Sequence, residues 1–238
     1  MRIIAVRQRS LRLIAMCSIA VFVLNLLTLR YLVSDSIETV NLAVLAGKTI
    51  SIDPGHGGID DGASGNGVVE KTVNLAIALK LKDILQAHDA AAVLTRDADI
   101  DYYTRGKGGK RNDLQRRVEL INASGAEVFV SIHVNSIKGL VRPGAQVFYG
   151  PKFAQSKALA EVMQQAMKHF PPGNKRQVKQ DKDILVLNAP TMPGILIEAG
   201  FLSDAKEAAL LLDDAYQQKL AEYIAKGLAY HFSQNVGR

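Results

Sequence analysis

The stretch ISIDPGHGGIDDGASGNGVVEKTVNL, residues 50–75, decides how the fold of this chain is interpreted. It begins as an apolar run that stops at Asp53-Pro54, and a loop follows with glycines at positions 55, 57, 58, 62 and 65. The loop contains one histidine, His56, and ends at Glu70, where a helical pattern begins. A strand, a glycine-rich loop and a helix in this order are typical of the first unit of an α/β domain.

The rest of the chain continues the alternation of strand and helix signals. Strands are predicted at 48–52, 91–95, 127–133, 145–149, 184–187 and 194–198, and helices at 71–87, 114–124, 154–169, 204–212 and 215–232. Most of these strands are continuous apolar runs, which suit a sheet buried on both faces. The pattern predicts a single α/β domain with about six mostly parallel strands and helices on both faces. Residues 97–112 are expected to form a surface loop, with Asp113 capping the next helix and Gly125 ending it.

An apolar segment lies near the N-terminus. The run Leu13–Leu29 follows four arginines, at positions 2, 7, 9 and 12. Its seventeen residues would span about 25 Å as a helix, against about 30 Å for a hydrocarbon core. Basic residues ahead of the run place the rest of the chain outside the cytoplasmic membrane. A signal peptide has the same layout, but no small-x-small site directly follows Leu29. We therefore expect a retained anchor, with residues 1–34 as basic tip and helix, 35–47 as linker and 48–233 as the α/β domain.

Composition narrows the possible functions. The single cysteine, Cys17, excludes an intramolecular disulfide and a cysteine-rich zinc cluster, so a metal would need histidines and carboxylates. The net charge is +6, and residues 1–40 carry half of it, with five arginines against two acidic residues. The remaining charge is too small to predict nucleic-acid binding. Two basic clusters are either solvated loop charge or contacts to an anionic polymer: Lys107/Lys110/Arg111 and Lys175/Arg176/Lys179/Lys182.

Four ionisable residues are expected at one edge of the sheet. His56 follows the first strand, and His133 and Glu198 end the third and the last. Carboxyl ends of parallel strands meet at one edge, and Glu70 returns there at the start of its helix. Two imidazoles and a carboxylate form a catalytic zinc set, and a second glutamate would move the proton of the attacking water. Two alternatives stay open at this point: lone histidines are more often surface or core residues, and a structural salt bridge could explain Glu198.

Four motifs carry a resemblance to a known family. In order, SIDPGHGG, VEKTVNL, SIHVNS and LIEAGFLS resemble those of the zinc-dependent N-acetylmuramoyl-L-alanine amidases of the bacterial cell wall, the amidase_3 family, over residues 48–232. The resemblance implies one Zn²⁺ held by His56, Glu70 and His133, with Glu198 as the catalytic carboxylate. It implies a peptidoglycan substrate, cut between the lactyl group of N-acetylmuramic acid and L-alanine. It also implies a six-stranded, mostly parallel sheet flanked by helices.

Within that family the chain is similar to the germination-specific, sporulation type. The short length, the N-terminal segment and the stretch KGGKRNDLQRRVELINAS carry this similarity. It implies a role in forming muramic-δ-lactam in the spore cortex, in the forespore intermembrane space. Division amidases insert a blocking helix before the catalytic glutamate, and the residues between His133 and Glu198 leave no room for one. Ser136 stands where the family usually has alanine, and it touches no proposed ligand. Whether a protein partner activates the enzyme is left open.

Weaker expectations concern the substrate groove. Asn135 lies two residues beyond His133, so it either contacts amide or sugar groups of the substrate or closes the strand as a turn residue. In the loop 97–112, two tyrosines and three basic residues could form a groove wall (Tyr102, Tyr103, Lys107, Lys110 and Arg111). Two rival functions are a zinc carboxypeptidase acting on wall peptides and a non-catalytic, membrane-anchored wall-binding module. The second would have no use for a general base at Glu198.

Overall fold

The computed structural model describes residues 8–104, 108–137 and 144–234, and it divides into two units, residues 1–39 and 40–238. The first unit contains one helix, α1 (Gln8–Glu38). Its segment Leu11–Leu29 has a mean hydropathy of 2.1, so it is long and apolar enough to cross a membrane, and none of it is buried. A signal sequence passes the same test.

The second unit is built on a six-stranded sheet in the order β4-β1-β5-β8-β6-β7. Neighbouring strands are parallel except β6 and β8, which are antiparallel. The predicted α/β fold with a mostly parallel sheet is confirmed. The strands are β1 (Thr49–Pro54), β4 (Ala91–Leu94), β5 (Val128–Asn135), β6 (Gln146–Tyr149), β7 (Lys179–Gln180) and β8 (Gly194–Phe201). A separate small hairpin, β2 (Ser64–Gly65) with β3 (Val68–Val69), lies inside the glycine-rich loop and was not predicted.

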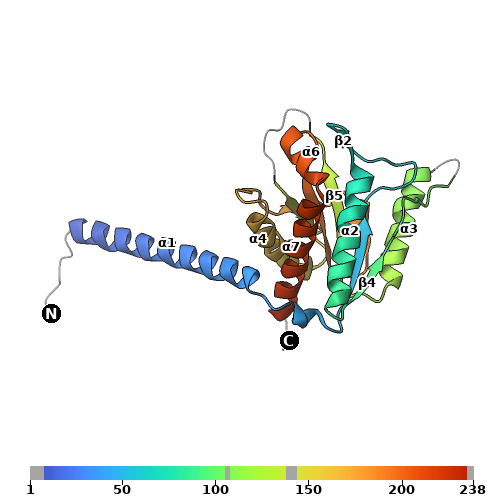
Figure 1. Cartoon of the computed structure of the whole chain (residues 1–238). Coiled ribbons are helices and arrows are strands. Elements are labelled where there is room, and N and C mark those ends of the chain that lie inside the picture. Colours follow the sequence, from blue (N-terminus) through green and yellow to red (C-terminus); the bar gives the residue numbers. More distant parts are fainter. Residues whose placement is uncertain (1–7, 105–107, 138–143, 235–238) are drawn as a thin grey trace. The chain divides into compact units, whose positions relative to one another are not determined.

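Helices cover both faces of the sheet, as predicted (Figure 1). On one face α2, α4 and α7 pack together, and on the other α3 packs against α5. The helices are α2 (Glu70–Ala87), α3 (Gly109–Ala123), α4 (Ala154–His169), α5 (Leu185–Asn188), α6 (Ala205–Leu211) and α7 (Asp214–Ser233), with a 3-10 turn, η1 (Leu42–Leu45), before β1. On the α3/α5 face, one buried cluster joins sheet and helices through Ile121, Phe129, Phe148, Val186, Leu187 and Leu196.

This cluster also shows which polar side chains share its side of the sheet. Side chains alternate between faces along a strand. Phe129 and Leu196 face α3 and α5, and therefore His133 and Glu198 do so as well. The polar residues of β5 and β8 thus lie under these two helices.

Four predicted elements were wrong in detail. The segment 184–187 is not a strand: Asp181 Oδ1 accepts bonds from the N–H groups of Asp183 and Ile184, and this turn starts α5 instead. A short apolar run suits a buried helix as well as a strand. The sixth strand is β7.

Asp113 does not cap α3, because the helix begins earlier, at Gly109, and Asp113 is buried within it. The N-cap of α3 is Gly108, at a φ of +96°, which lies inside the segment 97–112 that was predicted to be a loop. Strands β5 and β8 also run past His133 and Glu198, which therefore lie within the strands and not at their ends. Gly125, at a φ of +67°, follows the end of α3 as expected.

Candidate metal centre and active site

Three donor side chains converge at the carboxyl end of β1. His56 follows β1, Glu70 is the first residue of α2, and His133 belongs to β5. Each offers a ligand atom, and these atoms all lie within 4.8 Å of one another. Glu70 Oε1 is 2.9 Å from His133 Nδ1 and 3.3 Å from His56 Nε2. Two imidazoles and one carboxylate at this spacing suit a catalytic zinc site.

Glycines in the loop make this approach sterically possible. A Cβ atom on Gly55 would lie 2.2 Å from Cε1 of His133. On Gly62, which has a φ of +69°, a Cβ atom would lie 2.6 Å from Glu70 Oε2 and 2.6 Å from Cδ2 of His56. His56 itself has a φ of +59°, in the left-handed region that side chains other than glycine rarely adopt. The loop therefore needs glycines where the side chains of His56, Glu70 and His133 pack against the backbone.

Glu70 is held in place as an ionised carboxylate. Its Oε2 accepts a 2.6 Å bond from Ala63 N, and its Oε1 accepts bonds from Val134 N at 3.2 Å and Asn74 Nδ2 at 3.3 Å. Burial alone would raise the pKa of Glu70, but hydrogen bonds and charge from His133 and His56 together hold the pKa well below its usual range. A carboxylate that stays charged is the form that binds a metal.

Asp60 orients the ring of His56. Its Oδ2 lies 2.9 Å from Nδ1 of His56, which leaves Nε2 facing Glu70. Lys110 Nζ in turn lies 3.2 Å from the same carboxylate oxygen. Burial would lower the pKa of His56, but Glu70 and Asp60 raise it above the usual value. Carboxylates in this position fix the orientation of metal-binding histidines. Asp60 was not among the predicted site residues, although its position four residues after His56 was a signal.

Glu198 lies next to these donors but is not one of them. The pairing of β5 with β8 sets it directly opposite His133. Its Oε2 is buried and has no hydrogen-bond partner among the residues that the structure describes. Burial, reinforced by the charge of Glu70 and opposed by the two histidines, raises the pKa of Glu198 to about 7. The side chain has the environment of a proton acceptor near neutral pH.

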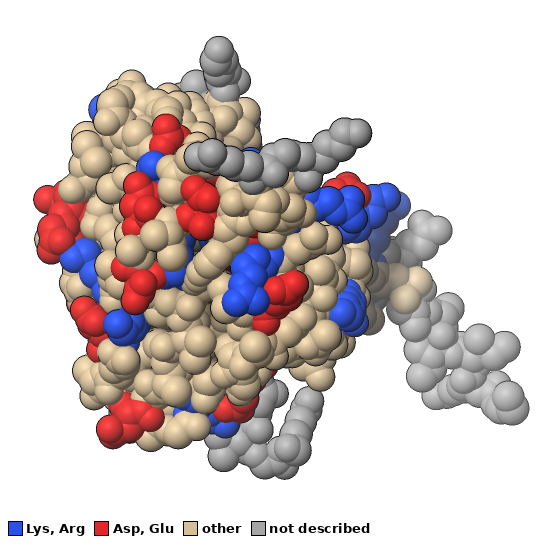
Figure 2. All heavy atoms as spheres, turned by 90° about the vertical axis from the view of Figure 1, so that its right-hand side faces the viewer, with Lys and Arg blue, Asp and Glu red and all other residues tan. Residues whose placement is uncertain are grey.

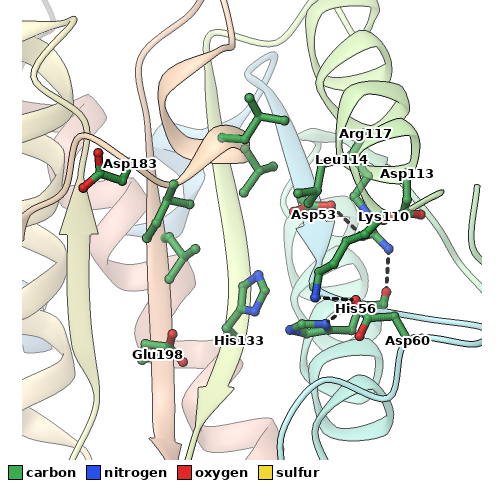
Figure 3. Close-up of a pocket in the computed structure, with 15 residues that line it drawn as sticks. Asp53, His56, Asp60, Lys110, Asp113, Leu114, Arg117, His133, Asp183 and Glu198 are labelled. Atoms are coloured by element: carbon green, nitrogen blue, oxygen red, sulfur yellow. Dashed lines mark hydrogen bonds and ion pairs between the residues drawn. The ribbon is translucent and has the colours of Figure 1, made fainter. Parts of the chain in front are cut away.

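A cleft of about 390 Å³ opens over this group (Figure 3). Figure 3 shows His133 between Glu198 on one side and His56 on the other, with Asp183 and Lys110 farther apart. The apolar part of the lining comes from α3, β8 and the α5 segment, as Leu114, Leu196, Ile184, Leu185 and Val186. Two polar sides and an apolar wall are typical of a substrate cleft.

Comparison with known proteins identifies the family. The model of the N-acetylmuramoyl-L-alanine amidase family Amidase_3 matches residues 50–230. This chain belongs to that family. The germination-specific N-acetylmuramoyl-L-alanine amidase of Bacillus subtilis is 41% identical over 194 residues, which cover 80% of this chain and 82% of that protein. The amidase LytC of the same organism is 35% identical over 79% of this chain and 36% of its own length.

A solved structure shows the same fold. The CwlD amidase from Clostridioides difficile, in complex with the GerS lipoprotein, has a TM-score of 0.76 and 38% sequence identity. The match covers 79% of this chain and 100% of that one. The chain is thus an N-acetylmuramoyl-L-alanine amidase that acts on peptidoglycan.

The residues predicted to form the groove wall and the two basic clusters lie at separate places on this amidase. Lys110 lines the cleft, whereas Tyr102 and Tyr103 line a separate open groove of about 450 Å³ beside α3. Lys107 lies outside the described residues. In the second basic cluster, the Arg176 guanidinium lies 3.9 Å above the Phe201 ring. Figure 2 shows acidic and basic side chains interspersed over most of the face it presents.

Asn135 is half-buried and is not among the residues that line the cleft. From His133 to Asn135 the pairing advances two residues on β5 but three on β8, from Glu198 to Phe201. The extra residue therefore lies in β8, and alternation along β5 keeps Asn135 on the side of His133. A contact between Asn135 and substrate stays a prediction.

Proposed function

We propose that this amidase binds one Zn²⁺ through His56, Glu70 and His133 and uses Glu198 as its catalytic carboxylate. The observation that carries the proposal is the group of three donor atoms within 4.8 Å of one another, with Glu198 opposite His133. The donors fit the metal, because two imidazoles and one carboxylate leave a position open. Oε2 of Glu198 has no hydrogen-bond partner within the described part of the chain, which fits a group that hydrogen-bonds to a water or to substrate.

The substrate bond is the amide between the lactyl group of N-acetylmuramic acid and L-alanine. When bound, zinc supplies a Lewis acid for the carbonyl and lowers the pKa of a water to about 7. Glu198 accepts the proton of the attacking water and returns it to the alanine nitrogen as the carbon–nitrogen bond breaks. Asp60 keeps the His56 ring oriented during this step, and the apolar wall beside α5 reduces contact of the reacting groups with water.

Product analysis tests this function. The full-length chain, in detergent, is incubated with purified peptidoglycan, with a chelator or with added zinc. We expect free L-alanine amino termini, intact stem peptides, loss of activity with the chelator and recovery with zinc. Cleavage between amino acids of the stem would instead show a carboxypeptidase. Wall binding with no cleavage at any zinc concentration would show a binding module.

We also propose that the substrate is the spore cortex and that cleavage leads to muramic-δ-lactam. The 41% identity to a germination-specific amidase supports this role. Spores that lack this protein should contain no muramic-δ-lactam in their cortex muropeptides, and the wild-type protein should restore it while Glu198→Gln does not. Lactam at the normal level in the deletion strain would contradict the role.

For the N-terminal region we propose a signal-anchor over residues 1–34, a linker over 35–47 and the zinc amidase domain over 48–233. The exposed apolar segment Leu11–Leu29 supports an anchor. The domain would then lie outside the cytoplasmic membrane, in the forespore intermembrane space. Because the similar C. difficile amidase was solved with a lipoprotein, a protein partner at the membrane is part of this proposal. Recovery of the full-length protein in the membrane fraction after a high-salt wash tests the anchor, and recovery of a shortened protein in the soluble fraction would contradict it.

A further inference from the structure

Arg117 of α3 is a fully buried arginine, 1% exposed, that borders the cleft. Its guanidinium makes four hydrogen bonds, at 2.6–3.0 Å. Two of them go to carboxylates, from Nε to Asp113 Oδ2 and from Nη1 to Asp53 Oδ1. The other two go to backbone carbonyl oxygens, from Nη1 to Pro54 O at 2.8 Å and from Nη2 to His56 O at 2.6 Å.

The two carboxylates explain how the charge is tolerated. Burial would lower the pKa of Arg117, but Asp53 and Asp113 raise it, so the guanidinium stays charged. Both carboxylates are held by further bonds: Asp53 accepts from Thr95 Oγ1 and Ser131 Oγ, and Asp113 accepts from Tyr102 N. A buried charge network of this kind is weak evidence for stability, because well-packed apolar residues would often serve as well. The same guanidinium also binds two backbone carbonyl groups, and its role is sought in what these bonds hold in place.

Those groups are the backbone on either side of Gly55. The carbonyl held at 2.6 Å belongs to His56, which has the unfavourable φ of +59°. The peptide that Arg117 fixes therefore belongs to the residue whose ring Nε2 faces Glu70. Arg96 holds the preceding carbonyls, Pro54 O at 2.9 Å and Gly55 O at 3.0 Å, but Arg117 reaches His56 itself.

We propose that Arg117 is a positioning residue for the metal centre: its forked bonds to the Pro54 and His56 carbonyls set the orientation of His56 as a ligand. This inference rests on the proposed function, in which His56, Glu70 and His133 bind zinc. A lysine cannot replace the guanidinium here, because a single ammonium group does not reproduce its fixed planar set of donors. Arg117 acts through His56 and touches no reacting atom.

The test compares Arg117→Lys with Arg116→Lys in the full-length chain. Arg116 is the neighbouring residue on α3, is exposed, and pairs with Glu119, so its variant is a matched control. The zinc dissociation constant is measured by competition with a chromophoric chelator, at a temperature where circular dichroism shows each protein folded. We expect Arg117→Lys to bind zinc about 10–100-fold more weakly, as for the loss of other groups that orient metal ligands. Arg116→Lys should bind like the wild type.

A second measurement separates orientation from stability. The cobalt-loaded Arg117→Lys protein should show an altered visible absorption spectrum, because its intensity depends on ligand geometry. Unchanged zinc affinity with an unchanged cobalt spectrum would overturn the proposal, even if the melting temperature falls. If Arg117→Lys does not fold, Asp113→Asn takes its place and should also weaken zinc binding, and wild-type affinity there would overturn the proposal. A wild-type protein that binds no zinc would overturn the proposed metal site itself.

Discussion

Replacing Glu198 by glutamine should abolish turnover while leaving zinc binding and the fold intact. Glutamine keeps the volume of the side chain but cannot accept the proton of the attacking water. General acid–base assistance contributes about 10²–10⁴-fold, so the activation barrier should rise by roughly 3–5.5 kcal/mol. Zinc content should not change, because the three donors in the group are His56, Glu70 and His133.

Glu198→Gln should lower turnover but raise the free energy of unfolding of the metal-free protein above neutral pH. The pKa of Glu198 is about 7 in the folded chain against an ordinary 4.5, which at 1.36 kcal/mol per pH unit corresponds to about 3 kcal/mol. Since the folded-state pKa is the higher one, the cost of the buried carboxylate appears as pH rises from about 4.5 and is complete above about 7. Glu198→Gln removes this cost. The variant should therefore exceed the wild type by less than about 1 kcal/mol at pH 5 and by about 3 kcal/mol at pH 8.

The assay measures turnover of muropeptides, zinc content, and urea unfolding with chelator present at pH 5 and pH 8. Glu207→Gln is the control, since Glu207 is a buried carboxylate that accepts bonds from Gly144 N and Phe201 N. In Glu207→Gln the side-chain NH2 group would face one of these N–H donors, which should lower the free energy of unfolding by about 1–3 kcal/mol. Turnover per folded molecule should stay unchanged. Loss of zinc from Glu198→Gln would make Glu198 a ligand. Loss of stability at pH 8 would return it to a structural role.

Three further predictions concern the ligands and the loop. His56→Ala and His133→Ala should each abolish zinc binding in equilibrium dialysis, and unchanged metal content in either would refute the ligand set. Asn135→Ala should lower muropeptide turnover without changing zinc content, whereas unaltered turnover would favour a turn-closing role. Gly62→Ala should weaken zinc binding because its Cβ meets Glu70 and His56; the control is Gly67→Ala, with a φ of +79° and nothing within 4 Å, which should only lose about 1–2 kcal/mol of stability. Equal zinc affinity of these two glycine variants would rule out the steric argument.

Much of the fold could be predicted from the sequence because its signals are local. Continuous apolar runs identified β1, β5 and β8, and helical periodicity identified α2, α4 and α7 within two residues at each end. The convergence of His56, Glu70 and His133 also followed from local pattern plus one topological rule, that parallel strands end at a common edge. Family resemblance supplied the roles, which spacing alone left open.

The errors arose where side chains distant in the sequence, or polar turns, determine the structure. The segment Ile184–Leu187 is apolar enough for a strand, but the carboxylate of Asp181 accepts bonds from the N–H groups of Asp183 and Ile184 and forms a turn directly before α5. Aspartate is common at helix N-caps, but the hydrogen-bond partners of Asp113 are Tyr102 and Arg117. Neither outcome is visible in a hydropathy pattern, because each depends on which donor a carboxylate meets in the folded chain.

A contact between residues distant in the sequence also helps to hold the conformation of the glycine-rich loop. A residue other than glycine in the left-handed region costs about 1–2 kcal/mol, and His56 is such a residue. A hydrogen bond to a charged group contributes about 1.5–3 kcal/mol, and Arg117 donates one to the His56 carbonyl. Arg117 lies 61 residues after His56 in the sequence. The free energy of its hydrogen bond is therefore large enough to offset the backbone strain at His56. Glycines allow His56, Glu70 and His133 to approach one another, whereas the bond from the buried arginine stabilises the loop conformation in which His56 faces Glu70.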